Sequence, residues 1–471
     1  MSSSALFGSV RHVHLIGICG TAMGSVAAML KERGFQVSGS DQSVYPPMST
    51  FLEERGITAQ SGFSPEHLNP RPDLVVVGNA ISRGNVELEA VLDQKLFYLS
   101  LPETLKFFFL RDTHNLVVTG THGKTTTTSL LAWVFEHAGK NPSFMIGGIP
   151  ANFSEGCRCS GGEHWILEGD EYDTAFFDKR SKFLHYLPEL LMINNLEFDH
   201  ADIFSSLDEI KKTFRRVVQI VPSSGMVVVN ADDRNAIEVT RDCRSQILEV
   251  GFSPNAAIRI TDASTDSEGS RFTLLGQSFF VPLFGMHNIH NAAMVAVAAH
   301  SYGISHRMIA SAFAAFRGIK RRLEVRAELH GITVIDDFAH HPTAIAGTIG
   351  ALRSRYPGRR LWVLFEPRSN TTRRNTFQQE LPESLKGADH VLLTEIARAD
   401  QLAPDERLDT GAVVEVLRLG GVGAERVEHT SDLVEAVEPQ LRSGDVVAFF
   451  SNGGFGGTIE SLIKALEHRA S

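Results

Sequence analysis

A glycine-rich turn with one lysine carries the clearest chemical signal in the sequence, in the stretch 117–126 (VVTGTHGKTT). It follows an apolar run at 116–118 and precedes a stretch, 127–138, whose apolar residues have helical spacing. The unpaired N–H groups of a helix N-terminus favour anions, and glycines let the backbone approach phosphate oxygens closely. We therefore predict that the following residues bind a nucleotide triphosphate: Gly120, Thr121, His122, Gly123, Lys124, Thr125 and Thr126.

Two residues of this turn have distinct expected roles. Lys124 supplies a positive charge for the terminal phosphates, and the Thr125 hydroxyl is placed to hold Mg²⁺. The general phosphate-loop pattern has a glycine five residues before Gly123, where this sequence has Val118. The alternative is a Gly/Thr turn with an exposed lysine, but the succession of strand, Gly-Lys-Thr and helix favours the nucleotide site.

Four carboxylates, those of Glu168, Asp170, Glu171 and Asp173, directly follow a predicted strand at 165–167. Carboxylates this close together repel one another unless they are solvated or paired with cations. An exposed acidic turn is the common outcome of a charge run, but the position at a strand end favours a metal-binding rim.

A histidine between two acids, His200 between Asp199 and Asp202, follows the next predicted strand at 190–193. A single histidine is usually structural, yet its place beside a nucleotide site favours a metal ligand. Because Mg²⁺ keeps several waters and takes few protein ligands, we predict three metal ligands: Thr125, Glu168 and His200. The predicted catalytic residues are Lys124, Glu168 and His200. The basic stretch 176–182 is predicted to be a turn, either solvated or in contact with an anionic substrate.

The N-terminal stretch has a βαβ pattern, with strands at 12–16 and 36–40 and a helix at 25–33. Its first turn is glycine-rich and its second strand ends in Asp41, an acid placed to reach a ribose. Because Cys19 and Ala22 replace two glycines of the dinucleotide fingerprint, a nucleotide-diphosphate ligand is favoured over a nicotinamide cofactor.

The C-terminal third repeats the alternation of strands and helices, with strands predicted at 332–335, 361–365, 391–394 and 446–450. The first of these ends in Asp337, which is placed to accept hydrogen bonds from ribose hydroxyls. Before this unit, Asn288 is predicted to cap a helix, and Asn291, one turn further in, to pair with an adenine edge. The basic stretch 318–322 is the predicted linker.

The composition is that of an ordinary globular protein: 471 residues, 43% hydrophobic and 21% charged, with a net charge of −10. The length requires two to four domains, and the acidic balance argues against nucleic acid. No apolar run is long enough to span a bilayer, so membrane insertion is not expected. The four cysteines (Cys19, Cys157, Cys159 and Cys243) do not resemble a disulfide framework or a zinc site, and we expect a reducing cytoplasm. The oligomeric state stays open.

Three α/β units with one triphosphate site and carboxylate-decorated strand ends favour phosphoryl transfer. No serine–histidine or cysteine–histidine arrangement for a covalent nucleophile stands out in the sequence. We therefore expect ATP to activate a carboxylate as an acyl phosphate, which a bound amine converts to an amide.

Motifs along nearly the whole chain resemble those of the Mur ligases of bacterial cell-wall synthesis. The resemblance is carried by the segments 17–24, 119–126, 168–173, 194–200, 287–291, 320–322 and 336–342. It implies an α/β fold of three domains: a Rossmann-like domain for a UDP-sugar at 1–111, a central phosphate-loop ATPase domain with extra strands at 112–320, and a Rossmann-like domain for the amine substrate at 321–471.

The resemblance also implies roles for individual residues. In ATP, Asn291 would contact the adenine, Arg322 the phosphate or ribose region, and Asp337 the ribose hydroxyls. Thr125 and Glu168 would hold one Mg²⁺, and Glu168 with His200 another. The implied UDP-sugar site consists of Gly17, Gly20, Thr21, Met23, Gly24, Ser40, Asp41, Asn79 and Ala80. Arg368 is the predicted clamp for a peptide carboxylate, because guanidinium and carboxylate pair through two hydrogen bonds.

A finer match within the family lies in the segments 17–21, 45–50, 178–183, 366–371 and 451–457. It implies a ligase of peptidoglycan recycling that joins UDP-N-acetylmuramate to the tripeptide L-alanyl-γ-D-glutamyl-meso-diaminopimelate. Ligation of L-alanine alone is the first alternative. A switch protein that binds UDP-sugar and ATP without ligation is the second.

Overall fold

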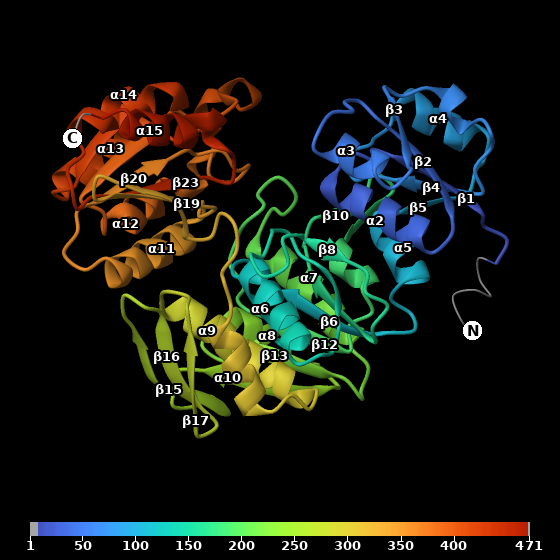
Figure 1. The fold of residues 1–471 in the computed structure, drawn as a ribbon, viewed down its shortest axis with the longest axis horizontal. Helices are drawn as coiled ribbons and strands as arrows, with labels where there is room; N and C mark the ends of the chain where they lie inside the picture. Colours follow the sequence, from blue (N-terminus) through green and yellow to red (C-terminus); the bar gives the residue numbers. More distant parts are fainter. Residues whose placement is uncertain (1–7, 470–471) are drawn as a thin grey trace.

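The computed structural model describes residues 8–469, which form three α/β units around a common centre. In Figure 1 the N-terminal unit lies at the upper right, the C-terminal unit at the upper left, and the central unit below both. Each unit is built on its own main sheet of mostly parallel strands. The mixed α/β class predicted from the alternating pattern is thus confirmed.

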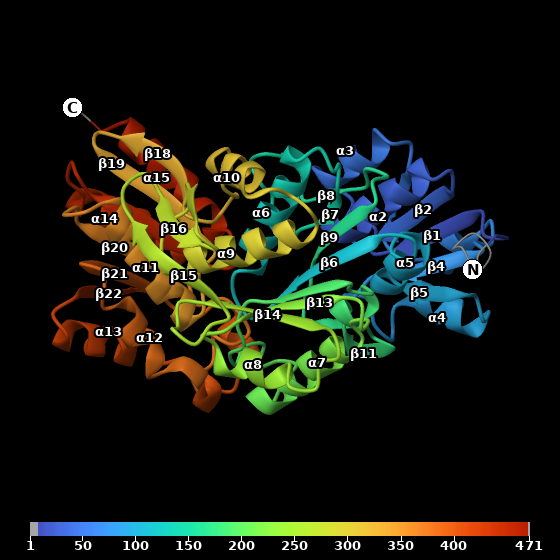
Figure 2. The ribbon, with the colours of Figure 1, turned by 90° about the horizontal axis from the view of Figure 1, so that it is seen from below.

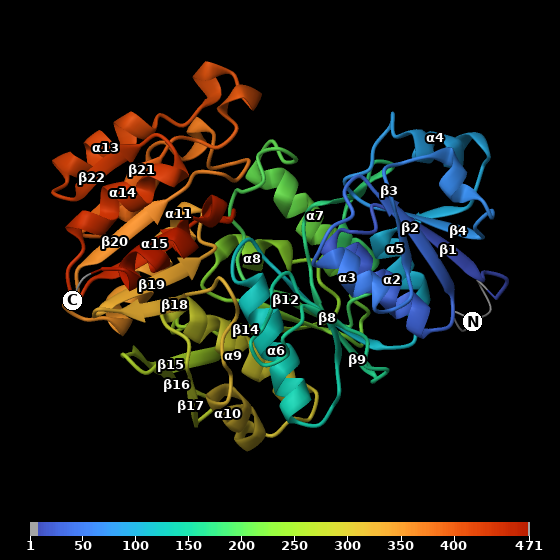
Figure 3. The same cartoon turned by 45° about the horizontal axis from the view of Figure 1, so that its top comes forward.

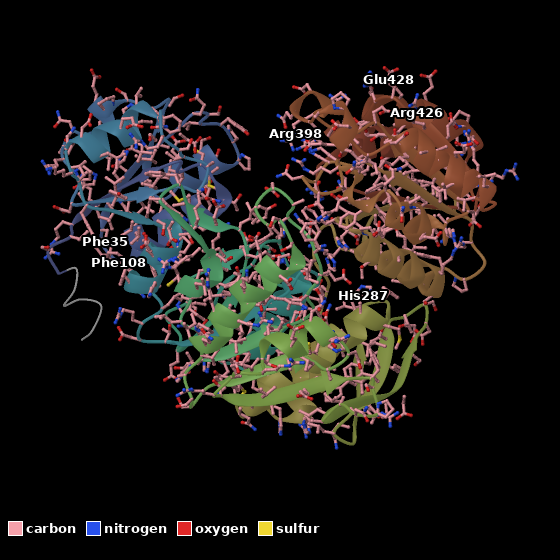
Figure 4. All side chains as sticks on the ribbon, turned by 180° about the vertical axis from the view of Figure 1, so that it is seen from behind. Phe35, Phe108, His287, Arg398, Arg426 and Glu428 are labelled. Carbon is pink, nitrogen blue, oxygen red and sulfur yellow. The ribbon has the colours of Figure 1, made fainter. Side chains whose placement is uncertain are left out.

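The N-terminal unit has a five-stranded parallel sheet in the order β3-β2-β1-β4-β5. Its strands are β1 (His12–Ile16), β2 (Gln36–Asp41), β3 (Thr58–Ser61), β4 (Leu74–Val77) and β5 (Tyr98–Ser100). Its helices are α2 (Thr21–Glu32), α3 (Met48–Glu53), α4 (Val86–Asp93) and α5 (Leu101–Phe108). Helix α2 begins four residues before the predicted start, so the glycine turn leads directly into a helix N-terminus. Figure 4 labels Phe35 and Phe108, whose rings meet edge to face at 5.5 Å between centroids.

The central unit has a ten-stranded sheet in the order β17-β16-β15-β14-β13-β12-β6-β9-β7-β8. Its strands are β6 (His114–Thr119), β7 (Ser143–Met145), β8 (Cys157–Arg158), β9 (His164–Glu168), β12 (Leu190–Ile193), β13 (Met226–Asn230), β14 (Gln246–Gly251), β15 (Ile258–Thr265), β16 (Ser270–Leu274) and β17 (Gln277–Val281). Strand β6 lies between β9 and β12 and is parallel to both. The three strand ends that the sequence marks as chemical therefore meet at one edge of the sheet.

Helices cover both faces of the central sheet, as Figure 2 shows: α6 (Lys124–His137), α9 (Met286–Ser301) and α10 (His306–Ala314) on one side, α7 (Leu207–Gln219) and α8 (Arg234–Val239) on the other. A strand that is buried on both faces has a continuous apolar sequence. Strand β12 (Leu190–Ile193) is such a strand, because all four of its residues are buried. Phe135 lies in the hydrophobic core on one face of the sheet and Phe214 in the core on the other.

The C-terminal unit has a six-stranded sheet in the order β18-β19-β23-β20-β21-β22, in which β18 is antiparallel. Its strands are β18 (Glu324–Leu329), β19 (Ile332–Asp337), β20 (Leu361–Phe365), β21 (His390–Thr394), β22 (Gly423–Val427) and β23 (Val446–Phe450). Its helices are α11 (Pro342–Arg355), α12 (Glu380–Leu385), α13 (Thr410–Leu419), α14 (Leu433–Val437) and α15 (Thr458–Glu467). Figure 3 shows α11, α13, α14 and α15 around this sheet.

Two local predictions are wrong. The basic stretch 176–182 is not a plain turn, because β11 (Asp178–Ser181) pairs with β10 (Asp173–Ala175) in a small hairpin. Asp178 accepts two hydrogen bonds from the Arg180 guanidinium, and the side chains of Arg180 and Lys179 remain largely exposed. Asn288 is not a helix cap either: α9 starts at Met286 after Gly285, and the Asn288 amide donates to the Phe284 carbonyl.

The chain passes from the first sheet to the second between Phe108 and His114, and from the second to the third between Ala314 and Glu324. We therefore keep residues 1–111, 112–320 and 321–471 as the proposed domains. Within residues 8–469, no helix is both long and apolar enough to cross a membrane. The four cysteines are free thiols.

Candidate active site

A cleft of about 1940 Å³ opens where the three units meet. The phosphate loop, the acidic rim after β9 and the segment after β12 line it from the central unit. Thr21 and Met48 line it from the N-terminal unit, and Asp337 and His340 from the C-terminal unit. A cleft reached by three units can bring three reactants together.

The loop from Gly120 to Gly123 turns from β6 into α6 with a backbone that glycine alone adopts easily. Gly120 has a φ of +130° and Gly123 a φ of +80°, both in a region that L side chains rarely occupy. A Cβ atom on Gly123 would lie 2.9 Å from the Asn291 Oδ1 atom and 3.0 Å from the Asn194 Nδ2 atom, so a side chain there would also push these two amides aside. The loop thus presents its backbone N–H groups at the N-terminus of α6.

The Lys124 ammonium lies back over its own loop. It donates to the Gly120 carbonyl at 2.6 Å, to the Thr121 carbonyl at 3.2 Å and to the Glu171 carboxylate at 3.0 Å. Burial alone would lower the pKa of Lys124, but the charges of Glu171 and Asp170 raise it above its ordinary value. Lys124 therefore carries its full charge at neutral pH.

Glu168 ends β9 directly beside the phosphate loop. It accepts from the Thr125 hydroxyl at 2.9 Å and from the Gly147 N–H at 2.7 Å. Burial raises the pKa of Glu168, and it outweighs the opposing effects of the Gly147 N–H, Lys124, Thr125 and Arg322. A half-buried carboxylate beside a threonine hydroxyl is the hard oxygen pair that Mg²⁺ prefers, so these two residues fit the predicted metal.

His200 lies one residue beyond Asp199 with a left-handed backbone, at a φ of +56°. Its Nε2 atom lies 3.0 Å from Glu171, and its ring packs against Tyr172. Burial would lower the pKa of His200, but Glu171 and Asp199 raise it. The structure thus pairs Thr125 with Glu168 directly, whereas the hydrogen-bond partner of His200 is Glu171.

The residues predicted for the adenosine part lie around the same cleft. Asn291 is buried beside Gly123 and donates to Asn288, while Arg322 approaches the Thr125 hydroxyl at 3.5 Å. The Asp337 carboxylate accepts from the N–H groups of Leu323 and Ala339, so its oxygens already have protein donors. Figure 4 labels His287, which lies close to this junction between the central and C-terminal units.

The residues predicted for the UDP-sugar lie around the first turn of the N-terminal unit. Gly17 has a φ of +88° and Gly20 precedes α2, which starts at Thr21. The Asp41 carboxylate accepts from the Cys19 N–H at 2.8 Å and so holds the turn. Of the other predicted residues, Met23, Gly24 and Ser40 are buried, whereas Asn79 and Ala80 are exposed after β4. Thr21 is the predicted member that lines the common cleft.

The predicted peptide clamp, Arg368, follows β20 in the C-terminal unit. Its guanidinium contacts Glu366 at 3.2 Å and is 43% exposed, so much of it remains accessible to a carboxylate. Its side chain also lies against Gly453 in the glycine-rich loop after β23. Arg368 does not line the common cleft.

A second set of contacts ties the segment around His200 to the C-terminal unit. The Thr371 hydroxyl donates to Asp199 at 2.8 Å and accepts from the Ala201 N–H, and the Asn370 amide donates to Asp202 at 2.8 Å. These bonds cross between two units, so they couple the position of the C-terminal unit to that of His200.

Replacing Thr371 by valine is expected to lower kcat about tenfold, because the hydrogen bond to a buried carboxylate disappears and the reactants are aligned less well. Steady-state phosphate release measures this effect. Thr410→Val is the matched control, because the Thr410 hydroxyl bonds Glu395 within the C-terminal unit. Equal losses in the two variants would contradict a role for the contact between units.

Another contact between units joins His122 of the phosphate loop, Glu197 and His341. The Glu197 carboxylate lies 3.0 Å from the His122 Nε2 atom and 3.5 Å from the His341 Nδ1 atom. The His341 ring also accepts from the Thr343 N–H and donates to the Phe198 carbonyl. Both nitrogens of His341 are therefore occupied, which favours a structural contact over a metal site.

This contact predicts a pH dependence of stability. Burial, with His122 nearby, lowers the pKa of His341 from 6.5 to about 4. Since the unfolded chain binds more protons between these values, stability is lost as the pH falls through this window. His341→Asn keeps a helix-capping side chain but removes the titrating group. The decrease in the free energy of unfolding between about pH 7.5 and about pH 5 should therefore be smaller in the variant, by on the order of 1 kcal/mol. Denaturant unfolding at both pH values measures it, and an unchanged loss would contradict the assignment.

The sequence pattern assigns no individual role to Glu171, Asn194 or Glu197. Glu171 was one acid in a cluster, and nothing in its spacing separates it from Asp170. Asn194 is buried against Thr127, to whose hydroxyl it donates, and its Oδ1 atom has no hydrogen-bond partner among the described residues. The role of each of these residues depends on how deeply its side chain is buried and where it points. Neither property can be predicted from a single sequence.

Comparisons with known proteins agree with this geometry. Residues 12–112 match the pattern described as "Mur ligase family, catalytic domain", residues 118–299 match "Mur ligase middle domain", and residues 321–453 match "Mur ligase, glutamate ligase domain". The three matches follow one another along the chain.

Three relatives illustrate the similarity. The UDP-N-acetylmuramate–L-alanyl-γ-D-glutamyl-meso-2,6-diaminoheptandioate ligase of Escherichia coli K12 is 41% identical, over 97% of this chain and 99% of the relative. The UDP-N-acetylmuramate–L-alanine ligase of Methylobacillus flagellatus is 32% identical, over 95% and 94%. The crystal structure of a murein peptide ligase from Psychrobacter arcticus 273-4 is 35% identical, with a TM-score of 0.71, over 98% of this chain and all of that one. The phosphate loop, the acidic rim and the three successive units thus have one explanation: the chain belongs to the Mur ligase family.

Proposed function

We propose that this protein joins UDP-N-acetylmuramate to the tripeptide L-alanyl-γ-D-glutamyl-meso-diaminopimelate, using ATP and Mg²⁺, in peptidoglycan recycling. The observation that carries the proposal is the cleft where the phosphate loop, Glu168 and His200 face both neighbouring units. The 41% identity over nearly the whole chain to a ligase named for this tripeptide supports the substrate.

The reaction transfers the γ-phosphoryl group of ATP to the carboxylate of the acid. The acyl phosphate then reacts with the amine of the tripeptide, and the products are an amide, ADP and phosphate. The first step brings the carboxylate and the triphosphate to within about 3 Å of each other, where like charges at an effective dielectric constant near 20 repel by several kcal/mol. Lys124 and the N-terminus of α6 offset this repulsion from the protein side.

Thr125 and Glu168 are the residues that would hold Mg²⁺, with His200 as a further ligand. Bound there, the ion would neutralise phosphate charge and polarise the reacting oxygens. Arg322 lies 3.5 Å from Thr125 and adds positive charge at the side of the C-terminal unit. Asn291, beside Gly123, is the proposed contact for the adenine ring, and we place the whole reaction in the cytoplasm.

The amine substrate decides between this proposal and L-alanine ligation. Purified protein is given ATP, Mg²⁺ and UDP-N-acetylmuramate, with either the tripeptide or L-alanine, and phosphate release is measured. Release that saturates with the tripeptide and barely responds to L-alanine is the expected result. Saturation by L-alanine without a response to tripeptide would contradict the proposed substrate, and ATP hydrolysis indifferent to both would favour a switch protein.

A further inference from the structure

Glu171 is a buried acid to which the proposed reaction gives no role. It is 3% exposed and lies between two groups that the reaction needs. One carboxylate oxygen lies 3.0 Å from both the Lys124 ammonium and the His200 Nε2 atom, and the other lies 2.9 Å from Lys124. No other carboxylate in the described chain has hydrogen bonds to both residues.

The contacts of Lys124 leave no N–H group unused. An ammonium has three N–H donors, and these meet the Gly120 carbonyl, the Thr121 carbonyl and Glu171. A phosphate oxygen can therefore bind Lys124 only by replacing one of them. Glu171 is the acceptor that carries a charge, and its charge has the same sign as that of the phosphate.

The contact with His200 fixes which ring nitrogen is available. A carboxylate can only accept, so the Nε2 atom of His200 carries a hydrogen and donates it to Glu171. The Nδ1 atom then carries the lone pair in the neutral ring. A carboxylate that holds a histidine in this way orients the other nitrogen toward a metal ion.

We propose that Glu171 is a positioning residue that pairs with Lys124 until the terminal phosphate of the nucleotide replaces it, and that it orients His200 throughout. This proposal rests on the proposed function. Without Glu171, Lys124 would be a buried and unpaired charge, which is costly. With it, nucleotide binding must exchange one ion pair for another, so the carboxylate weakens ground-state binding of ATP.

Glu171→Gln separates the charge from the shape, because an amide oxygen still accepts from His200 but does not repel phosphate. We expect the affinity for a non-hydrolysable ATP analogue, measured by calorimetry, to rise by about tenfold both with Mg²⁺ and with chelator present. A damaged fold would not tighten binding. Glu238→Gln is the matched control, since Glu238 pairs with Lys211 and does not line the cleft, and the affinity of this variant should stay unchanged.

The second measurement is turnover. Glu171→Ala should lower kcat more than Glu171→Gln does, because alanine leaves the His200 ring without its acceptor. The proposal would be overturned if Glu171→Gln bound the analogue with unchanged or weaker affinity in chelator. It would also be overturned if the variant lost affinity only with Mg²⁺, because Glu171 would then be a metal ligand. Failure of the unaltered protein to bind the analogue would instead contradict the proposed function itself.

Discussion

Lys124→Ala is expected to lower turnover by at least about 10³-fold, because Lys124 is the only lysine or arginine in the loop 120–126 and its charge offsets the phosphate charge that develops during transfer. Binding of UDP-N-acetylmuramate should stay within a factor of about two, since its proposed site lies in another unit and makes no contact with Lys124. Phosphate release measures the first quantity and calorimetry with the UDP-sugar measures the second.

Lys140→Ala is the control for this prediction. Lys140 follows the C-terminal end of α6 and is exposed, far along the helix from the phosphate loop. Its removal should leave turnover unchanged. Equal losses of turnover and of UDP-sugar binding in Lys124→Ala would show that the division of roles among the units is wrong.

Glu168→Ala is expected to have the second largest effect, a fall in kcat of about 10²- to 10³-fold with a loss of the response to Mg²⁺. The reason is the pairing of its carboxylate with the Thr125 hydroxyl at the end of β9. Titration of ADP with and without Mg²⁺ measures the response. In the unaltered protein Mg²⁺ should tighten ADP binding, and in the variant it should not.

Binding of ADP in chelator should survive the same change, because the adenine contact proposed for Asn291 does not involve Glu168. Glu163→Ala provides the control, because Glu163 is exposed just before β9 and its replacement also removes one negative charge. A variant Glu168→Ala that responds to Mg²⁺ as the unaltered protein does would exclude Glu168 as a ligand.

The strands that carry the site were predictable because they are buried on both faces. The strands at 190–193, 361–365 and 446–450 have the predicted bounds, since a continuous apolar run bounded by polar residues has no other stable place in an α/β unit. The meeting of the phosphate loop with Glu168 was also predictable, because parallel strands end at one edge of a sheet.

Contacts between units could not be predicted in the same way. Thr371 and Asp199 are 172 residues apart, and no local pattern marks either as a partner of the other. Glu171 and Asp170 look alike in the sequence, yet Glu171 points to Lys124 while Asp170 pairs with Lys182. These partners depend on how the chain turns after β9, where the Ser181 hydroxyl of β11 donates to the Glu171 carbonyl at 2.6 Å.

The central claim is that the acid, the amine and the triphosphate meet in one cleft and react through an acyl phosphate. Its most direct test uses UDP-N-acetylmuramate with ¹⁸O in the lactyl carboxylate, together with ATP, Mg²⁺ and the tripeptide, and mass spectrometry of the released phosphate. We expect one ¹⁸O atom in each phosphate released by ligation, because the carboxylate oxygen that attacks phosphorus leaves with it. Unlabelled phosphate alongside amide product would contradict the account.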